Sequence, residues 1–122
     1  MNYKGILIEE SLANPNILDD FKILATKIYP VTSSHKTPWL TQWTLHTVEV
    51  PEKDAERLAE KLTTSFDKQH PHSWYADYKN ERYHFIIFQN KVFKVELAKP
   101  TLYKEVKEYG LSIGIPQHQL DF

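Results

Sequence analysis

A carboxylate and an imidazole lie close together in the most aromatic stretch of the chain, Ser73 to Val95. Asn80 and Glu81 separate two runs typical of β-strands, and a two-residue turn there would place Asp77 directly opposite His84. A carboxylate beside an imidazole fixes its tautomer and favours its protonated form, as general acid–base catalysis requires. The sequence therefore predicts either an acid–base pair or a buried polar pair with a structural role.

Aromatic side chains fall on both faces of this predicted hairpin. Tyr75 shares a face with the acid–base pair. The opposite face carries Trp74, Tyr78, Tyr83 and Phe85. Four rings on one sheet face are typical either of a surface that docks a partner, a ligand ring or unstacked bases, or of a surface covered by the chain itself. Both interpretations stay open from the sequence.

The next predicted strand indicates which face of the hairpin is buried. Phe93, Val95 and Leu97 alternate with charged residues, so their side of the strand faces the core. Antiparallel pairing puts these three side chains on the face that carries His84. We therefore expect the acid–base pair to point toward the core.

Trp43 and His46 are further candidates for ligand binding. They fall on opposite faces of one predicted strand, which argues against a single shared site and favours a core tryptophan. If the protein is a small enzyme or a small-molecule binder, the site is expected at Asp77 and His84, joined by His46, Tyr75 or Trp43.

Metal and cofactor sites have little support. Asp67, His70 and His72 lie close together around Pro71, yet no second ligand pair at a recognised spacing accompanies them, and the chain has no cysteine. Its three glycines cannot build a P-loop or a dinucleotide fingerprint, and the common hydrolase and metalloprotease motifs are missing. We expect no metal and no cofactor, and enzyme activity has no support from a motif.

Composition bounds the remaining classes of function. The chain has 122 residues, 41% of them apolar and 25% charged, which is typical of one soluble domain spanning 1–122. A formal net charge of −1 gives no overall attraction for phosphate backbones, so nucleic acid is not an expected partner. The N-terminal sequence reads as neither a signal peptide nor a membrane anchor, and we expect a cytoplasmic protein.

Hydrophobic periodicity, together with residues that commonly begin or end helices and strands, predicts the elements that position these residues. Strands are predicted at 3–9, within 21–31, at about 42–50, on either side of Asn80 and Glu81, and within 92–97. A short helix is predicted to begin at Asn14 and Pro15, the best-supported helix is predicted at 51–66, and the last helix at 100–114. This order predicts a single α+β domain, with a largely antiparallel sheet of five to six strands and two main helices packed on one face.

Several short segments together resemble a known group of proteins. They are LIEESL, HKTPWLTQWTLHTVEVP, WYADYKN, YHFIIFQNKVFKV and YGLSIGIPQHQLDF. The chain is similar in these segments to a family of small, uncharacterised bacterial and archaeal proteins of about this length, with no established function. The resemblance implies a compact single-domain protein and carries over no catalytic residue.

The leading hypothesis from the sequence is a binding or interaction module that self-associates as a homodimer, through a sheet surface or an exposed strand edge. The first alternative is a small-molecule-binding protein or small enzyme that uses Asp77 and His84. The second is weak single-stranded RNA binding through the aromatic face, as sheet-platform domains do.

Overall fold

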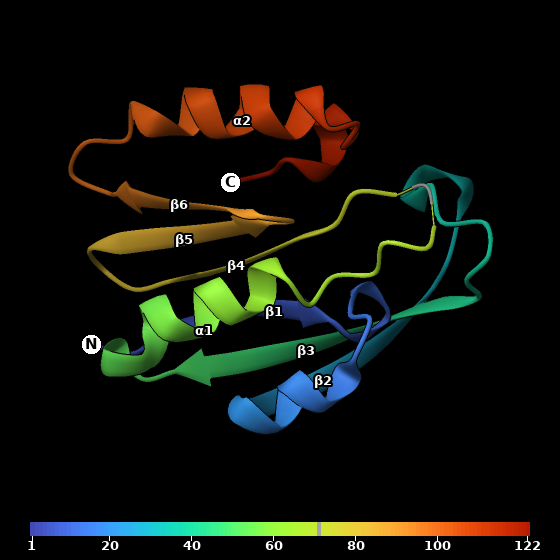
Figure 1. Cartoon of the computed structure of the whole chain (residues 1–122), viewed down its shortest axis with the longest axis horizontal. Coiled ribbons are helices and arrows are strands. Elements are labelled where there is room, and N and C mark those ends of the chain that lie inside the picture. Colours follow the sequence, from blue (N-terminus) through green and yellow to red (C-terminus); the bar gives the residue numbers. More distant parts are fainter. Residues whose placement is uncertain (71) are drawn as a thin grey trace.

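Six strands form one antiparallel sheet in the computed structural model, which describes residues 1–70 and 72–122 (Figure 1). The strands are β1 (Tyr3–Ile8), β2 (Lys22–Pro30), β3 (Gln42–Val50), β4 (Tyr75–Lys79), β5 (Tyr83–Phe88) and β6 (Lys91–Glu96). Their order across the sheet is β2-β3-β1-β4-β5-β6, so β2 and β6 form its edges. The main helices are α1 (Ala55–Thr63) and α2 (Leu102–Ser112). The predicted single α+β domain and largely antiparallel sheet are confirmed.

Local signals explain where several elements begin and end. The Asn14 side chain accepts a hydrogen bond from the backbone N–H of Asn16 at 3.1 Å, and Pro15 opens a 3-10 helix, Pro15–Asp20. Gly114 follows α2 with φ of 93°, a conformation that side chains with a Cβ rarely adopt. None of the helices in the described ranges is long and apolar enough to cross a membrane.

The two main helices pack on opposite faces of the sheet. Phe85 of β5 belongs to the same core as Leu62 of α1, whereas its neighbour Ile86 belongs to a second core with Val106 of α2. The expectation of both helices on one face was therefore wrong. The physical reason lies in β5 itself, where nearly every side chain from Tyr83 to Phe88 is buried, so that both faces of the strand need cover.

We name the two sides of the sheet after these helices. The α1 face carries Tyr3, Leu7, Val48, Val50, Tyr78 and Phe85, and the α2 face carries Ile6, Ile8, Trp43, Asp77, Ile86 and Phe88. Figure 1 shows α2 above β5 and β6 and away from β3 and β2. The α2 face is consequently open over the β1, β3 and β2 half of the sheet, where Ile6 is 43% exposed.

A short seam joins the two halves of the sheet. β1 and β4 pair over only three residues, with Gly5 opposite Tyr78 and Ile6 opposite Asp77. A Cβ on Gly5 would lie 1.9 Å from the backbone oxygen of Asp77 and 2.5 Å from the Cα of Tyr78. Glycine is therefore required for the two strands to approach so closely, and it sets the position of Asp77 against β1.

The β4–β5 hairpin differs from the prediction in register and agrees in faces. Asp77 pairs with Ile86, and His84 pairs with Lys79, so Asp77 and His84 are diagonal neighbours rather than directly opposite. A shift of two residues keeps every side chain on its predicted face. Asp77 and His84 therefore still share the α2 face.

The turn explains this shift. Asn80 pairs with Tyr83, and Glu81 and Arg82 form the turn, one residue later than predicted. The side-chain oxygen of Asn80 accepts hydrogen bonds from the backbone N–H groups of Arg82 and Tyr83, both at 2.8 Å. Asparagine before a turn commonly hydrogen-bonds the backbone two residues on, which fixes its place ahead of the turn.

Candidate functional site

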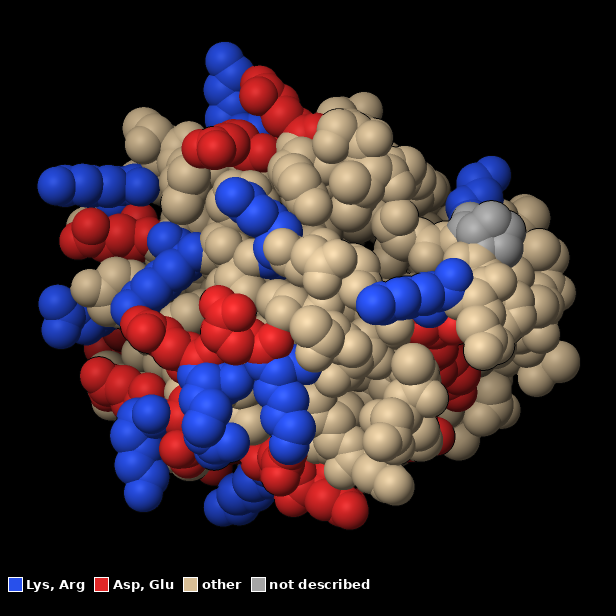
Figure 2. Space-filling view, viewed as in Figure 1, with Lys and Arg blue, Asp and Glu red and all other residues tan. Residues whose placement is uncertain are grey.

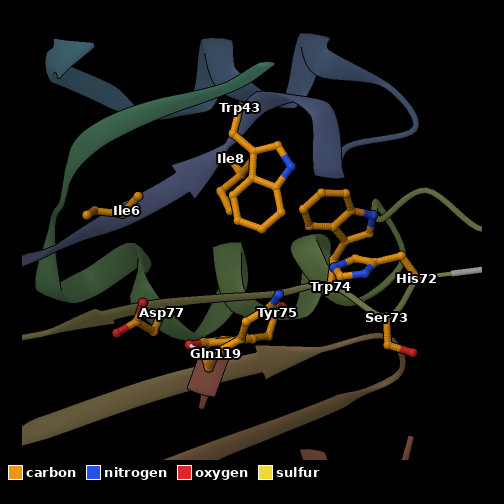
Figure 3. A pocket seen from close by; sticks show the side chains of 9 residues that line it. All are labelled: Ile6, Ile8, Trp43, His72, Ser73, Trp74, Tyr75, Asp77 and Gln119. Atoms are coloured by element: carbon orange, nitrogen blue, oxygen red, sulfur yellow. Dashed lines mark hydrogen bonds between the residues drawn. The ribbon is translucent and has the colours of Figure 1, made fainter. Parts of the chain in front are cut away.

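A groove of about 250 Å³ opens on the α2 face, where β1, β3 and β4 meet the C-terminal segment (Figure 3). Its walls are mainly apolar and aromatic, from Ile6, Ile8, Trp43, Trp74 and Tyr75. Ligand pockets range from roughly 300 to 1,000 Å³ and are mostly apolar with a few polar groups. The groove therefore has the composition of a ligand site for a molecule of about one ring.

Asp77 lies at one end of this groove (Figure 3). Behind it, His84 contacts Asp77, and Tyr103 contacts His84. Nε2 of His84 lies 2.7 Å from Oδ2 of Asp77, and Nδ1 of His84 lies 2.7 Å from the Tyr103 hydroxyl of α2. An ionised carboxylate can only accept, so the Nε2–H donates to Asp77. The predicted contact between Asp77 and His84 is thus formed, with Tyr103 as a third member that the sequence did not indicate.

The three members differ in what they expose. The His84 side chain is 3% exposed, whereas that of Asp77 is 35% exposed. Burial, and then the negative charge of Asp77, raises the pKa of Tyr103, which keeps its hydroxyl protonated and able to donate to Nδ1. Of these three residues, a ligand in the groove can therefore contact only Asp77. Any direct proton transfer to or from the ligand would involve this carboxylate rather than His84.

The C-terminal segment forms the wall beside Tyr75. The Tyr75 hydroxyl donates to the backbone oxygen of Gln119, and the Gln119 amide donates to the carbonyl oxygens of Ser34 and His35 at 3.2 and 3.1 Å. These bonds tie Gln119, which lines the groove, to Tyr75 of β4 and to the distant segment Ser34–His35. The Tyr75 ring is thereby fixed with its hydroxyl turned into the protein.

Rings from β3 and from the segment just before β4 close the other end of the groove. The ring centroid of Trp74 lies 5.2 Å from that of Trp43 and 4.4 Å from that of His72. Burial lowers the pKa of His72, against a smaller opposing effect from the backbone of Lys36, so the imidazole is neutral near pH 7.

Figure 2 shows charged side chains gathered over the end of the molecule where β1 and α1 begin, and few over the opposite end.

Tyr78, Tyr83 and Phe85 share the α1 face as predicted, whereas Trp74, which precedes β4, is buried in the same core and also borders the groove. Trp74, Tyr78 and Phe85 are buried in the core that α1 closes, while Tyr83 is half-buried beneath Lys94. The Lys94 ammonium lies 4.4 Å from the Tyr83 ring centroid. Of the two interpretations that the sequence left open, cover by the chain itself accounts for this surface.

Trp43 and His46 lie on opposite faces of β3, as predicted, so they do not form one site. Trp43 lines the groove, whereas His46 is buried on the α1 face. Nδ1 of His46 lies 2.8 Å from the Thr26 hydroxyl, and Nε2 lies 2.9 Å from Oε1 of Glu9. These contacts tie β2, β3 and the segment after β1 together.

Metal ligands do not converge. Nδ1 of His70 lies 2.7 Å from Oδ2 of Asp67, while the His70 ring stacks on Trp39 with centroids 4.5 Å apart. Within residues 1–70 and 72–122, no three histidine or acidic side chains come together so that they could hold a metal ion. Pro71 lies outside the described residues.

Sequence reasoning missed five residues of this site: Ile6, Ile8, Ser73, Gln119 and Tyr103. The two isoleucines share one side of β1 because they are two residues apart in a strand, but the sequence does not reveal that this side faces a groove. Gln119 and Tyr103 come from the C-terminal part of the chain, and their approach to β4 depends on which face of the sheet α2 covers.

Comparisons with protein-family models, with curated proteins and with solved structures gave no match. The resemblance drawn from short segments of the sequence stays a prediction. The geometry of the groove therefore carries the functional proposal.

Proposed function

We propose that this protein, which we place in the cytoplasm, binds a small organic molecule in the groove of the α2 face. One observation carries the proposal: a partly exposed carboxylate, Asp77, is fixed from behind by buried His84 at the end of an otherwise apolar and aromatic groove. Ligand sites combine apolar walls with a few oriented polar groups in this way. Asp77 is the polar anchor of the ligand.

The fixed position of Asp77 supports binding rather than a purely structural role. The buried His84 already has both ring nitrogens engaged, by Asp77 and by Tyr103. A carboxylate held in place before the ligand arrives loses little conformational freedom on binding, which favours affinity. A pair with only a structural role would not need one of its members to face a groove.

Tryptophan indole signals provide a direct test of this proposal. Trp43 and Trp74 line the groove, whereas Trp39 does not. We expect fragments from a small-molecule library to shift the indole N–H resonances of Trp43 and Trp74 in a nitrogen-15 NMR titration, with smaller shifts at Trp39. If every fragment moves Trp39 most, or if none moves any indole, the groove is not the binding site.

Self-association is a second candidate, supported by the open β2 edge. Every residue of β2 is exposed, including apolar Ile23, Ile28 and Tyr29 at 43%, 61% and 45%. We propose that two copies pair through this edge, because an unpaired strand can extend a sheet into an identical edge. Sedimentation should show a dimer that Ile28→Glu converts to monomer, and a wild-type monomer at high concentration would contradict it.

RNA binding is not proposed. The rings that would stack on bases, Trp74, Tyr78 and Phe85, are at most 3% exposed. Base stacking requires ring faces that are open to the nucleic acid.

A further inference from the structure

We infer that the groove selects an organic cation, an ammonium group carried on a body of about one aromatic ring. This inference rests on the proposed function and narrows the ligand to positively charged organic molecules. Three observations support it: the charge of the groove lining, the arrangement of its aromatic rings, and the electrostatic environment of Tyr75.

Asp77 is the only formally charged side chain among the described residues that line the groove. His72, at the far end, is neutral near pH 7 because burial lowers its pKa. A cation that enters the groove therefore meets one negative charge and no positive one. An anion would meet only the carboxylate, without a donor of opposite charge.

The nearest lysines on the same face do not cancel this charge. Lys4 and Lys79 lie two residues along β1 and β4 from Ile6 and Asp77, and neither forms an ion pair with Asp77 within the described parts of the chain. Residues two apart on a strand are separated by roughly 6 to 7 Å. Both lysine side chains are exposed, so water and salt screen them strongly.

Aromatic rings supply the second part of the recognition. Figure 3 shows the rings of Trp43 and Tyr75 on opposite sides of the groove, with Asp77 beyond Tyr75 on β4. The face of an aromatic ring attracts a cation within about 6 Å, most strongly for tryptophan. A ligand whose ammonium pairs with Asp77 would place its short alkyl or aryl body between the two rings, against Ile8.

Two negative charges, Asp77 and Asp121, act on the Tyr75 hydroxyl at this side of the groove. Burial raises the pKa of this hydroxyl most, and the negative charges of Asp77 and Asp121 raise it further. The same charges that oppose a phenolate at Tyr75 favour a cation nearby. The shape and the electrostatics of the groove thus point to the same class of ligand.

Three probes with one phenyl ring and different head groups test the inference: phenethylamine, phenethyl alcohol and hydrocinnamate. Affinities are measured from the indole shifts of Trp43 and Trp74 at about pH 7.5, where the amine is charged. We expect the amine to bind about tenfold more tightly than the alcohol, and the carboxylate to bind most weakly.

Two charge-neutralising variants test whether Asp77 causes the preference for the amine. Asp77→Asn should erase the preference for the amine, whereas Asp19→Asn, an exposed carboxylate in the 3-10 helix Pro15–Asp20, should leave it unchanged. The nitrogen-15 spectrum of each variant reports whether it is folded. The wild-type preference among the three probes is interpretable even if Asp77→Asn fails to fold.

The outcomes separate the inference from the proposed function. If alcohol or carboxylate binds as tightly as the amine at Trp43 and Trp74, the groove is a ligand site and the cation inference is wrong. If none of the probes shifts these indoles, the inference is overturned, and the fragment screen decides whether the groove binds any other molecule. An amine preference that survives Asp77→Asn also contradicts it.

Discussion

The two halves of the sheet differ in how far their apolar strands are covered. β5 lies between α1 and α2, and Phe88 at its end is fully buried. β2, at the other edge, is exposed along its whole length, with Ile28 at 61%. The groove lies at the border, where cover by α2 and the C-terminal segment ends, and the comparison shows that this open face leaves room for a ligand.

Each half also holds one buried histidine beside a carboxylate. His84 fixes Asp77, which faces the apolar groove, whereas His46 contacts Glu9, whose side chain is 44% exposed on the other side of the sheet. The chemistry of the two pairs is alike, but their surroundings differ. The proposed binding role rests on the apolar walls beside Asp77 rather than on the histidine–carboxylate pair itself.

The largest expected effect compares a core position with an edge position. Phe88→Ala should lower the free energy of unfolding by roughly 3 to 5 kcal/mol, because it leaves a cavity among Tyr75, Phe93 and Tyr109. Ile28→Ala should cost no more than about 0.5 kcal/mol, as exposed substitutions usually do. Urea denaturation of both variants measures the difference, and equal costs would contradict the contrast between the two halves.

A second substitution tests the seam. Gly5→Ala should destabilise the fold by roughly 1 to 3 kcal/mol or more, because the added methyl group overlaps the backbone of Asp77 and Tyr78. Thermal unfolding provides the measurement. Gly114→Ala is a useful control, since a Cβ there meets no atom within 4 Å and only its positive φ opposes the change. A neutral Gly5→Ala would show that β1 and β4 do not pack so closely.

Removing one hydroxyl tests the support behind Asp77. Tyr103→Phe leaves Nδ1 of His84 without its partner and should cost about 1 kcal/mol of stability. It should also weaken phenethylamine binding, because the carboxylate is held less firmly. Tyr29→Phe, at an exposed hydroxyl in β2, is the matched control and should change neither quantity. Unchanged stability and affinity in Tyr103→Phe would show that the third member of the network has no role.

The smallest effect concerns pH. Because burial lowers the pKa of His72, the unfolded chain binds a proton that the folded chain resists. The contribution of His72 is complete above the unfolded pKa of about 6.5 and is lost as the pH falls toward the lower folded value. Stability of His72→Asn should therefore decline less between pH 7.5 and about pH 5.5 than that of the wild type. If the stability of His72→Asn fell by as much as that of the wild type over this pH range, His72 would not be held neutral by burial.

Much of the fold could be predicted because local signals agree with the final packing. β3 was predicted at the residues that form it, and Asn14, Pro15 and Gly114 mark element ends as expected. Alternation along β4, β5 and β6 also placed Asp77 and His84 on one face. A two-residue error in the hairpin register did no harm, since it preserves that alternation.

The groove could not be predicted, because it depends on which strands remain uncovered. Nothing in the local pattern shows that β1 lies between β3 and β4, or that α2 covers only part of its face. Tyr103 and Gln119 lie at the site only because of this strand order and the packing of α2 on this face. The side of α2 was nevertheless open to inference from β5, whose consecutive apolar residues require cover on both faces.

The most direct test of the central claim is to locate a bound ligand by intermolecular nuclear Overhauser effects with phenethylamine. We expect contacts from its phenyl protons to the methyl groups of Ile8 and the ring of Trp43, and from the methylene beside its nitrogen to the Cβ protons of Asp77. Contacts confined to the methyl groups of Ile23 and Ile28 in β2 would place the ligand on the open edge and contradict the assignment of the groove.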